Sequence, residues 1–356
     1  MSLKAYDTAR KRWRHLNFFQ HEAFLHAPAP RVKCPSCGIR RARVPWARPR
    51  SGFTLLFEAL VVTMAAQMPV RAVGRIVGEH DTRLWRIVKH HVDEARAAAD
   101  HGGVKVVGVD EKACRRGHSY VTFFADLDKR RLLYATRGRK SGVLGEFRAD
   151  LEAHGGSGDG VRELCMDMSA AYMKGARESF PAAEVTFDRF HVVKLLNEAV
   201  EKVRRTEQKG RPELKRSRWL WLWNPERLSP DQREHLDELL DPSQVALDTA
   251  EAYRLKLAFQ EFWTLPPDLA ALHLELWCLH AEESELVPMV KVAGTIRRHS
   301  AGILRWLHSR ISNGMLEAMN SLVQAAKVRA RGYRTIENFI TMAYLVCGKL
   351  TFNLPT

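Results

Sequence analysis

Apolar residues recur at helical spacing from Phe53 onward and predict three consecutive helices. We expect these helices at residues 53–67, 70–78 and 82–98. Two short helices joined by a tight turn are typical of a helix-turn-helix, whose last helix enters the major groove of DNA. Arg83, Arg86 and Lys89 recur every three residues on that last helix, as a stripe facing a groove requires. The alternative is a plain helical bundle with a basic, solvated face.

Local signals set the ends of these three helices. Thr54 is suited to cap the first helix, because its hydroxyl can accept a hydrogen bond from a free backbone N–H. Pro69 ends that helix, and Gly78 ends the second. Asp81 or Thr82 is expected to cap the third.

After the polar residues 100–103 the apolar period changes to two, which predicts strands. Strands are expected at residues 104–110, 119–127, 130–138, 161–166 and 183–187, with helices at 143–153 and 170–179. Three consecutive strands followed by helix, strand, helix and strand is the order of the ribonuclease-H-like fold. The predicted fold class is therefore α/β, with a mixed sheet.

This topology places two acidic residues side by side. The first strand would lie in the middle of the sheet with the fourth beside it, so Asp110 and Asp167, which close those two strands, become neighbours. Two like charges this close repel each other unless a cation offsets them. The alternative is that both aspartates are ordinary solvated turn residues. That interpretation is reasonable for either aspartate alone, but it is weaker for two aspartates at matched positions on neighbouring strands.

Residues 191–310 interrupt the sheet with helical patterns and predict an all-helical insertion. Within it, Trp219, Trp221 and Trp223 alternate with apolar residues among Arg and Lys. They could form a stacking platform for unpaired bases or simply fill a core, and the sequence does not choose between the two.

A last helix is expected to begin near Ser312, which can cap it. Glu317, Asn320 and Gln324 share one face of that helix, because they lie three and seven residues apart. A basic run follows, with Lys327, Arg329, Arg331 and Arg334, and it is suited to contacts with a phosphate backbone.

The charge of the chain is uneven. The net charge is +15 over 356 residues, and residues 1–50 alone hold 12 Lys and Arg against 2 Asp and Glu. This basic segment, which shows little apolar periodicity, favours a polyanionic partner. A basic tail that only aids solubility is the alternative.

Cys34 and Cys37 form a single CxxC, which supplies half of the four ligands of a structural zinc. His15, His21 and His26 could complete the site or be ordinary surface histidines. The other cysteines are scattered, as in a reducing cytosol. No apolar stretch is long enough to suggest a signal peptide or a membrane span, so we expect a cytoplasmic protein.

Several motifs together resemble bacterial insertion-sequence transposases of the ISL3 family. They are GVDE (108–111), DMSAAY (167–172), FDRFHVVKLLNEAVEKVRR (187–205), SNGMLEAMN (312–320) and RARGYR (329–334). The helical region that begins at Phe53 is similar to the DNA-binding region of that family. The resemblance covers nearly the whole chain and implies a DDE transposase.

Asp110, Asp167 and Glu317 would then be the catalytic triad and would bind two Mg²⁺ or Mn²⁺ ions. Asp188 and His191, in the DRFH motif, and Asn320 would have supporting roles.

The resemblance also implies binding to double-stranded DNA, at transposon ends and at a target, by a homodimer or larger assembly without any membrane. The expected divisions are a basic segment (1–50), a helix-turn-helix (51–100), the first part of the core (101–190), the insertion (191–310) and a returning catalytic region (311–356).

Family members have a four-cysteine zinc finger, of which this sequence holds only two cysteines. That departure makes zinc binding doubtful. It also leaves two alternatives open: a truncated or impaired transposase that only binds DNA, and a ribonuclease-H-like nuclease that cuts without joining.

Overall fold

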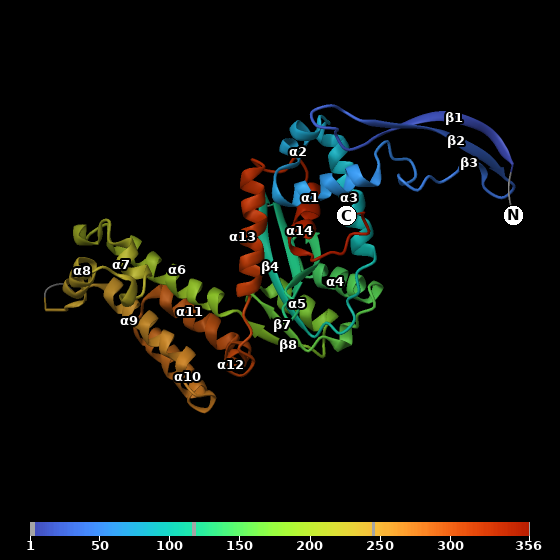
Figure 1. Ribbon diagram of the computed structural model, residues 1–356. Helices are drawn as coiled ribbons and strands as arrows, with labels where there is room; N and C mark the ends of the chain where they lie inside the picture. The colour runs from blue at the N-terminus through green and yellow to red at the C-terminus, as the bar shows by residue number, and fades with distance from the viewer. Residues whose placement is uncertain (1–3, 116–118, 244–245, 356) are drawn as a thin grey trace.

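The computed structural model describes residues 4–115, 119–243 and 246–355 of the chain (Figure 1). A mixed α/β core lies in the middle, a lobe of helices lies on one side of it, and a small sheet projects on the other (Figure 1). In the described part of the chain, no helix has the length and apolar content needed to cross a membrane.

The small sheet is antiparallel, in the order β1 (Ala5–Arg14), β2 (Phe24–Cys34) and β3 (Gly38–Arg41). Periodicity did not predict this sheet, because Arg and Lys occupy positions where a strand pattern normally shows apolar residues. Its core is small: Trp13, Ala29 and Ala47 are the fully buried members.

Helices α1 (Leu55–Gln67), α2 (Val70–Val77) and α3 (Asp81–Ala97) follow as predicted. The Thr54 cap is confirmed, since its hydroxyl accepts a hydrogen bond from the Phe57 N–H, and Gly78 ends α2 in the left-handed conformation. The predicted cap of α3 was wrong. The His80 ring, rather than Asp81 or Thr82, accepts the hydrogen bond from the Thr82 N–H.

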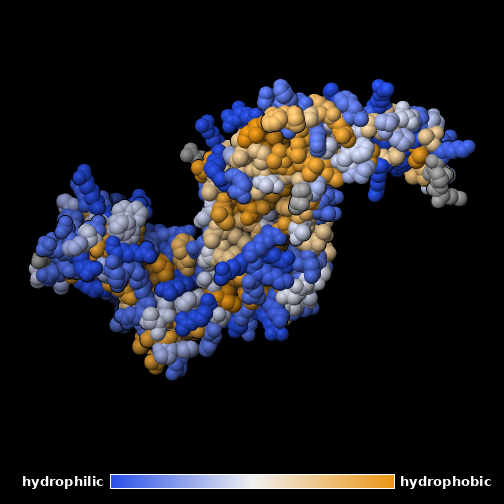
Figure 2. Space-filling model, viewed as in Figure 1, coloured by the Kyte–Doolittle hydropathy of each residue, from blue (hydrophilic) through white to orange (hydrophobic). Residues whose placement is uncertain are grey.

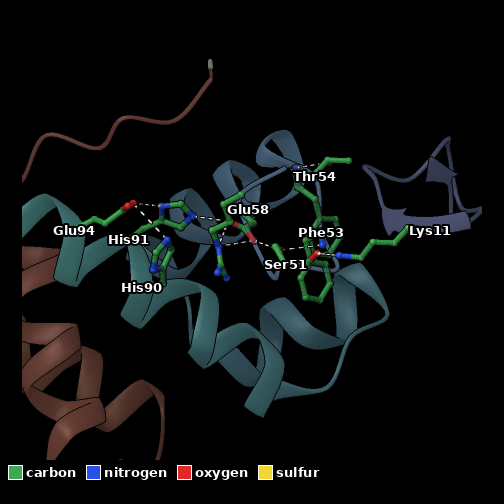
Figure 3. A network of polar contacts seen from close by, with 10 residues as sticks. Lys11, Ser51, Phe53, Thr54, Glu58, His90, His91 and Glu94 are labelled. Atoms are coloured by element: carbon green, nitrogen blue, oxygen red, sulfur yellow. Dashed lines mark hydrogen bonds and ion pairs between the residues drawn. The ribbon is translucent and has the colours of Figure 1, made fainter. Parts of the chain in front are cut away.

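A buried carboxylate holds the helices together (Figure 3). Glu58 of α1 has no exposed surface, although it sits in an apolar helix. Its oxygens accept hydrogen bonds from Arg48 Nε at 2.9 Å and from Ser51 Oγ at 2.6 Å, and the Nε2 atom of His91 on α3 lies 2.6 Å away. These contacts tie the segment before α1 to both helices, so Glu58 has a structural role.

The core sheet has the order β6-β5-β4-β7-β8. Its strands are β4 (Val106–Arg115), β5 (Ser119–Asp126), β6 (Arg131–Arg137), β7 (Glu163–Met166) and β8 (Glu184–Phe187). The strands β4, β5 and β6 are antiparallel, whereas β7 and β8 run parallel to β4. The expectation that the first strand of this sheet lies in the middle, beside the fourth, is confirmed.

Each face of the sheet has its own core, because side chains alternate along the strands. Phe124 packs on one face with α4 (Gly142–Ala153) and α5 (Ala170–Ser179). Phe123 packs on the other with the three helices α1 to α3, with α13 (Gly314–Arg329) and with α14 (Ile336–Cys347). Helix α14 was missed in the sequence.

The insertion forms a helical lobe with its own core. Its helices are α6 (Arg189–Glu207), α7 (Arg218–Leu222), α8 (Pro230–Leu240), α9 (Asp248–Glu261), α10 (Pro267–Glu283), α11 (Val287–Arg298) and α12 (Ser300–Ser309). Trp221 is buried and fills the core, as one of the two alternatives expected, whereas Trp219 and Trp223 are 52% and 40% exposed.

Hydrophilic residues cover most of the lobe in the space-filling view, and hydrophobic residues gather over the region of α1 and α2 (Figure 2). Leu56 and Leu60 of α1 and Ile76 of α2 are among the exposed apolar side chains.

We predict that Glu58→Gln lowers the free energy of unfolding by about 3 kcal/mol at pH 7, because it removes one partner of a buried ion pair. Burial by itself raises the pKa of Glu58, but His91, Ser51 and Arg48 outweigh it and hold the pKa below its ordinary value of 4.5. The ionised form therefore stabilises the fold fully above pH 4.5, and this contribution is lost as the pH falls through the lowered pKa.

Urea denaturation of both proteins between pH 3 and pH 8 measures the difference, which should shrink in acid. Glu94→Gln is the matched control, since Glu94 lies at the exposed edge of the same cluster. Equal stability of Glu58→Gln and the natural protein at pH 7 would contradict the structural role.

Candidate functional site

Three aspartates lie at one level across neighbouring strands. Parallel pairing joins Gly108 to Cys165 and Cys165 to Thr186, so two residues further along, Asp110, Asp167 and Asp188 share one row. The sequence predicted that Asp110 is the last residue of its strand. That prediction was wrong, because β4 continues to Arg115 beside β5. Asp110 lies instead at the level where the shorter neighbouring strand β7 ends. Beyond that point β7 no longer covers this side of β4, and the acids lie there.

Segments from far along the chain reach Asp110. Its Oδ1 atom accepts a hydrogen bond from the Glu111 N–H at 2.8 Å, and its Oδ2 atom accepts one from Asn320 Nδ2, on α13, at 2.6 Å. His191 Nε2, on the first turn of α6, lies 3.9 Å from Oδ1. Asp167 in turn accepts a hydrogen bond from the Ser169 N–H at 3.0 Å.

The carboxylates of this cluster repel one another. Burial raises the pKa of Asp110, and the charge of Asp167 adds to that rise against the effects of His191, the Glu111 N–H and Asn320. Burial likewise raises the pKa of Glu317, and the negative charges of Asp188 and Asp110 raise it further. Helix α13 thus carries Glu317 to the side of the sheet where the aspartates lie, but among the described residues no three acids of this cluster have ligand atoms within 4.8 Å of one another. Hard oxygen ligands with unbalanced negative charge fit a divalent cation.

Helix α13 reaches the sheet through its amino terminus. The predicted cap at Ser312 was wrong, because Asn313 occupies the N-cap position. The Asn313 side chain makes no capping hydrogen bond; its Nδ2 atom donates instead to the Val109 carbonyl of β4 at 3.1 Å. The close approach requires glycine at position 108: a Cβ atom there would lie 2.7 Å from Leu316 Cδ1. Glu317 follows within the first turn of the helix.

Asp188 lies beside this amino terminus. Its side chain is buried, its Oδ1 atom accepts a hydrogen bond from the Asn313 N–H at 3.4 Å, and its Oδ2 atom has no hydrogen-bond partner among the described residues. Burial raises the pKa of Asp188, and the charge of His191 opposes the rise. A buried carboxylate oxygen without a partner is uncommon and again fits a cation.

Two members of the site were missed in the sequence. Glu111, next to Asp110 in GVDE, has a pKa raised by burial and by the charge of Asp167, although Arg139 opposes this. Its position directly after a candidate ligand was the available signal. Asn313 was passed over for Ser312, and no local pattern separates two adjacent capping residues.

A hollow of about 490 Å³ adjoins the acids and lies between the core and the helical lobe. Asp188 and Glu317 line it from one side, and Trp223 and Arg227 line it from the other. Arg189 of α6 also contributes, so the hollow combines acidic, basic and aromatic walls.

The basic stripe on α3 is partly paired. Arg83 forms an ion pair with Glu79 and packs over the Phe53 ring, and Lys89 pairs with Asp93. Arg86 is exposed, and no ion pair of its side chain is found in the described part of the chain.

The basic run at the end of α13 lies close to two other elements. Lys327 Nζ donates to the Ala113 carbonyl of β4 at 3.4 Å, and Arg329 donates to the Gln67 carbonyl at the end of α1 at 2.8 Å. Arg331 and Arg334 are exposed.

Cys34 and Cys37 lie where β2 turns into β3. Hydrogen bonds from Ser36 and Cys37 lower the pKa of the Cys34 thiol to about 6, which favours the thiolate that binds metals. Within the described residues, no third ligand joins the two sulfurs at metal-binding spacing. His15 bonds instead to the Thr54 hydroxyl.

Comparison with known proteins gives three family matches. A model described as a transposase, of the ISL3 type of DDE enzymes, matches residues 107–343. The helix-turn-helix domain of transposase family ISL3 matches residues 42–92, and the zinc-finger of transposases IS204, IS1001, IS1096 and IS1165 matches residues 2–37.

Two similar relatives are transposases of insertion sequences. The transposase of IS1001 from Bordetella parapertussis is 28% identical over 351 residues, which cover 94% of this chain and 84% of the relative. The transposase of IS1557 from Mycobacterium tuberculosis is 28% identical over 382 residues, which cover 97% of this chain and 83% of the relative.

We predict that Gly108→Ala lowers the free energy of unfolding by about 1–3 kcal/mol, because the new methyl group forces α13 away from β4. Gly145→Ala is the matched control, since a Cβ atom there meets nothing closer than the Ser179 hydroxyl at 3.6 Å. In that helix, alanine should be neutral or stabilising. Urea denaturation followed by tryptophan fluorescence measures both variants, and an unaltered Gly108→Ala protein would contradict the close approach.

Proposed function

The chain belongs to the ISL3 family of insertion-sequence transposases and is a DNA transposase, and from that premise we propose that its core is a ribonuclease-H-like domain that cuts and joins DNA. One observation carries the proposal. Asp110 of β4 and Asp167 after β7 share one row of the sheet, and Glu317 lies on α13 three residues before Asn320, whose side chain bonds to Asp110. The strand order supports the same fold.

In this proposal Asp110, Asp167 and Glu317 are the ligands of two Mg²⁺ or Mn²⁺ ions. Each of the three would hold an ion through its carboxylate oxygens, which are the hard ligands that these ions prefer. When bound, such ions lower the pKa of the attacking water and stabilise the attacking and leaving oxygens.

The reaction has two stages and no covalent enzyme intermediate. In the first stage, the water oxygen bonds to the phosphorus at the transposon end, and the bond to the 3′ oxygen breaks to free a 3′-hydroxyl. In the second, that hydroxyl attacks a phosphodiester of the target DNA, and the target's own 3′ oxygen leaves. Each stage exchanges one P–O bond for another, so no outside energy source is needed.

The supporting residues position the ligands. Asn320 and the Glu111 N–H fix the two oxygens of Asp110, which sets the direction of its remaining lone pairs. Asp188 holds the amino terminus of α13 through the Asn313 N–H and thereby sets the place of Glu317. His191 moderates the negative charge of both Asp110 and Asp188.

DNA would be held by several parts of the chain. The helix-turn-helix would bind double-stranded transposon ends through Arg83, Arg86 and Lys89. The run from Lys327 to Arg334 would contact the phosphate backbone. Exposed Trp223 lines the hollow next to Glu317, where an unpaired base could stack. Two ends must be held together, so we propose a homodimer or larger assembly on DNA.

Two other functions agree with part of these observations. A protein that binds transposon ends without cutting them is favoured by the single CxxC, whereas the converging acids oppose it. A ribonuclease-H-like nuclease that cuts without joining would use the same acids, so only an assay of strand transfer separates it from a transposase.

We predict that Asp110→Ala and Glu317→Ala each abolish Mg²⁺-dependent cleavage of DNA that carries the element's ends, while leaving end binding within about threefold of the natural protein. Nicking, strand-transfer and mobility-shift assays on the same preparations separate the three functions. Asp128→Ala, at an exposed turn of the core, is the control and should cut normally. Normal cutting by either triad variant would refute the assignment.

In the proposed complex Arg86 contacts a base. We therefore predict that Arg86→Ala weakens binding to the transposon ends by about 1–3 kcal/mol and reduces the sequence preference of that binding. Lys174→Ala removes the same charge from exposed α5 and is the control. Mobility shifts at several salt concentrations separate a base contact from a phosphate contact, because a lost phosphate contact lowers the salt dependence. Unchanged binding by Arg86→Ala would rule out α3 as the recognition helix.

A further inference from the structure

We propose that His101, Asp150 and His154 form a binding site for one divalent transition-metal ion, such as zinc, at the junction between the helix-turn-helix and the core. The site is separate from the acidic cluster and from Cys34 and Cys37. It does not depend on the function proposed above.

The three residues come from two segments that are joined through the backbone. His101 lies in the connection between α3 and β4, whereas Asp150 and His154 lie at the carboxyl end of α4. The His101 N–H donates to the His154 carbonyl at 2.9 Å, and the two imidazole rings stack with centroids 4.7 Å apart. One ligand atom from each of the three residues lies within 4.8 Å of the others.

Two ligand atoms lack partners although they are buried. His101 is 3% exposed, and its Nδ1 atom has no hydrogen-bond partner within the described chain. Asp150 Oδ2 is likewise buried without a hydrogen bond, although His154 Nδ1 lies 3.6 Å from it, while Oδ1 of the same carboxylate accepts a hydrogen bond from Arg96. Buried polar atoms are nearly always bonded, so His101 Nδ1 and Asp150 Oδ2 fit a missing ligand, whereas the Nε atoms of Arg96 and Arg131, which also lack a hydrogen bond, would gain nothing from a cation.

The third residue is already oriented for metal binding. His154 Nδ1 lies 2.7 Å from the Asp150 carbonyl oxygen, which can only accept a hydrogen bond. The proton is therefore on Nδ1, and the lone pair of Nε2 is free. A histidine that ligates a metal commonly donates its other ring N–H to a backbone carbonyl in this way.

The protonation state of His101 also suits a ligand. Burial, then the charges of His154, Arg131 and Arg96, lower the pKa of His101 to about 4, so the ring is neutral at physiological pH. The two arginines would oppose a cation, but each lies beside a carboxylate: Arg96 binds Asp150, and Arg131 lies 3.6 Å from Asp126. The negative charge of Asp100 raises the pKa of His101 and so opposes the effect of the two arginines.

Two imidazole nitrogens and one carboxylate oxygen are a ligand set that zinc accepts, with water in the fourth position of a tetrahedron. A hollow of about 660 Å³ reaches the site at His101, although Asp150 and His154 do not line it and its other polar walls include Arg96, Lys129 and Arg131. It would be the route of the ion and its water from solvent. A bound ion would fasten the connection after α3 to α4. It would thereby stabilise the attachment of the DNA-binding region to the core.

The test uses the full chain, stripped with a chelator and kept in excess Mg²⁺ so that the acidic cluster is occupied. Zn²⁺ is titrated in competition with a chromophoric chelator. We expect His101→Phe, which keeps the buried ring stack, and His154→Gln each to weaken one site by more than about tenfold. Zn²⁺ should raise the Tm of the natural protein but not of these variants.

The control is the double variant Cys34→Ser and Cys37→Ser, which should retain this site. His90→Gln is a second control, because His90, His91 and Glu94 form another group with metal-binding spacing. Equal uptake by the natural protein and His101→Phe would overturn the proposal, as would uptake that disappears only in the cysteine variant.

A measurement on the natural protein alone guards against variants that fail to fold. In a long-range ¹⁵N–¹H spectrum of the histidines, Zn²⁺ should shift the ring nitrogens of His101 and His154. Unshifted ring-nitrogen resonances of His101 and His154 at saturating Zn²⁺ would overturn the proposal.

Discussion

The acidic centre depends on the contact between the first turn of α13 and the middle of β4. Without a side chain at Gly108, Leu316 and Asn313 can lie against the strand, and Asn313 bonds to the Val109 carbonyl. Asn320, two turns further along the helix, then reaches Asp110. Glu317 lies between these two contacts, so its distance from Asp110 is set by a glycine and two amides rather than by any attraction between the acids.

Glu58 and the aspartates of the acidic cluster differ in their partners. Glu58 is paired with Arg48 and lies beside His91, which lowers its pKa and makes it a structural element. Asp110 and Asp167 instead accept hydrogen bonds mainly from neutral amides. Amides orient a carboxylate without cancelling its charge. The cluster therefore keeps the negative potential that a pair of cations requires.

The helical lobe is fastened to the sheet at both of its ends. Helix α6 follows directly after β8, and α12 packs along the same strand, where a Cβ atom at Gly302 would meet the Phe187 ring at 2.5 Å. Arg305 of α12 binds both Glu163 and Glu184, which face each other on β7 and β8 and would otherwise repel. The long insertion thus returns the chain to the sheet edge from which α13 starts.

The sequence by itself determined the elements whose apolar period is strong: the helices α1 to α3, the five core strands and their order, and from that order the pairing of Asp110 with Asp167. Periodicity also separated the helical insertion from the sheet. It failed where basic residues mask alternation, as in β1 to β3, and it missed α14.

Only the tertiary structure decided how distant segments meet. The arrival of Asn320 at Asp110 and the contact of Asn313 with Val109 depend on packing across more than two hundred residues. The inclusion of Glu111 and the burial of Trp221 between two exposed tryptophans depend on contacts between nearer segments. Local propensity carries no information about such contacts, because the residues that make them gain their energy only when the folded surfaces come together.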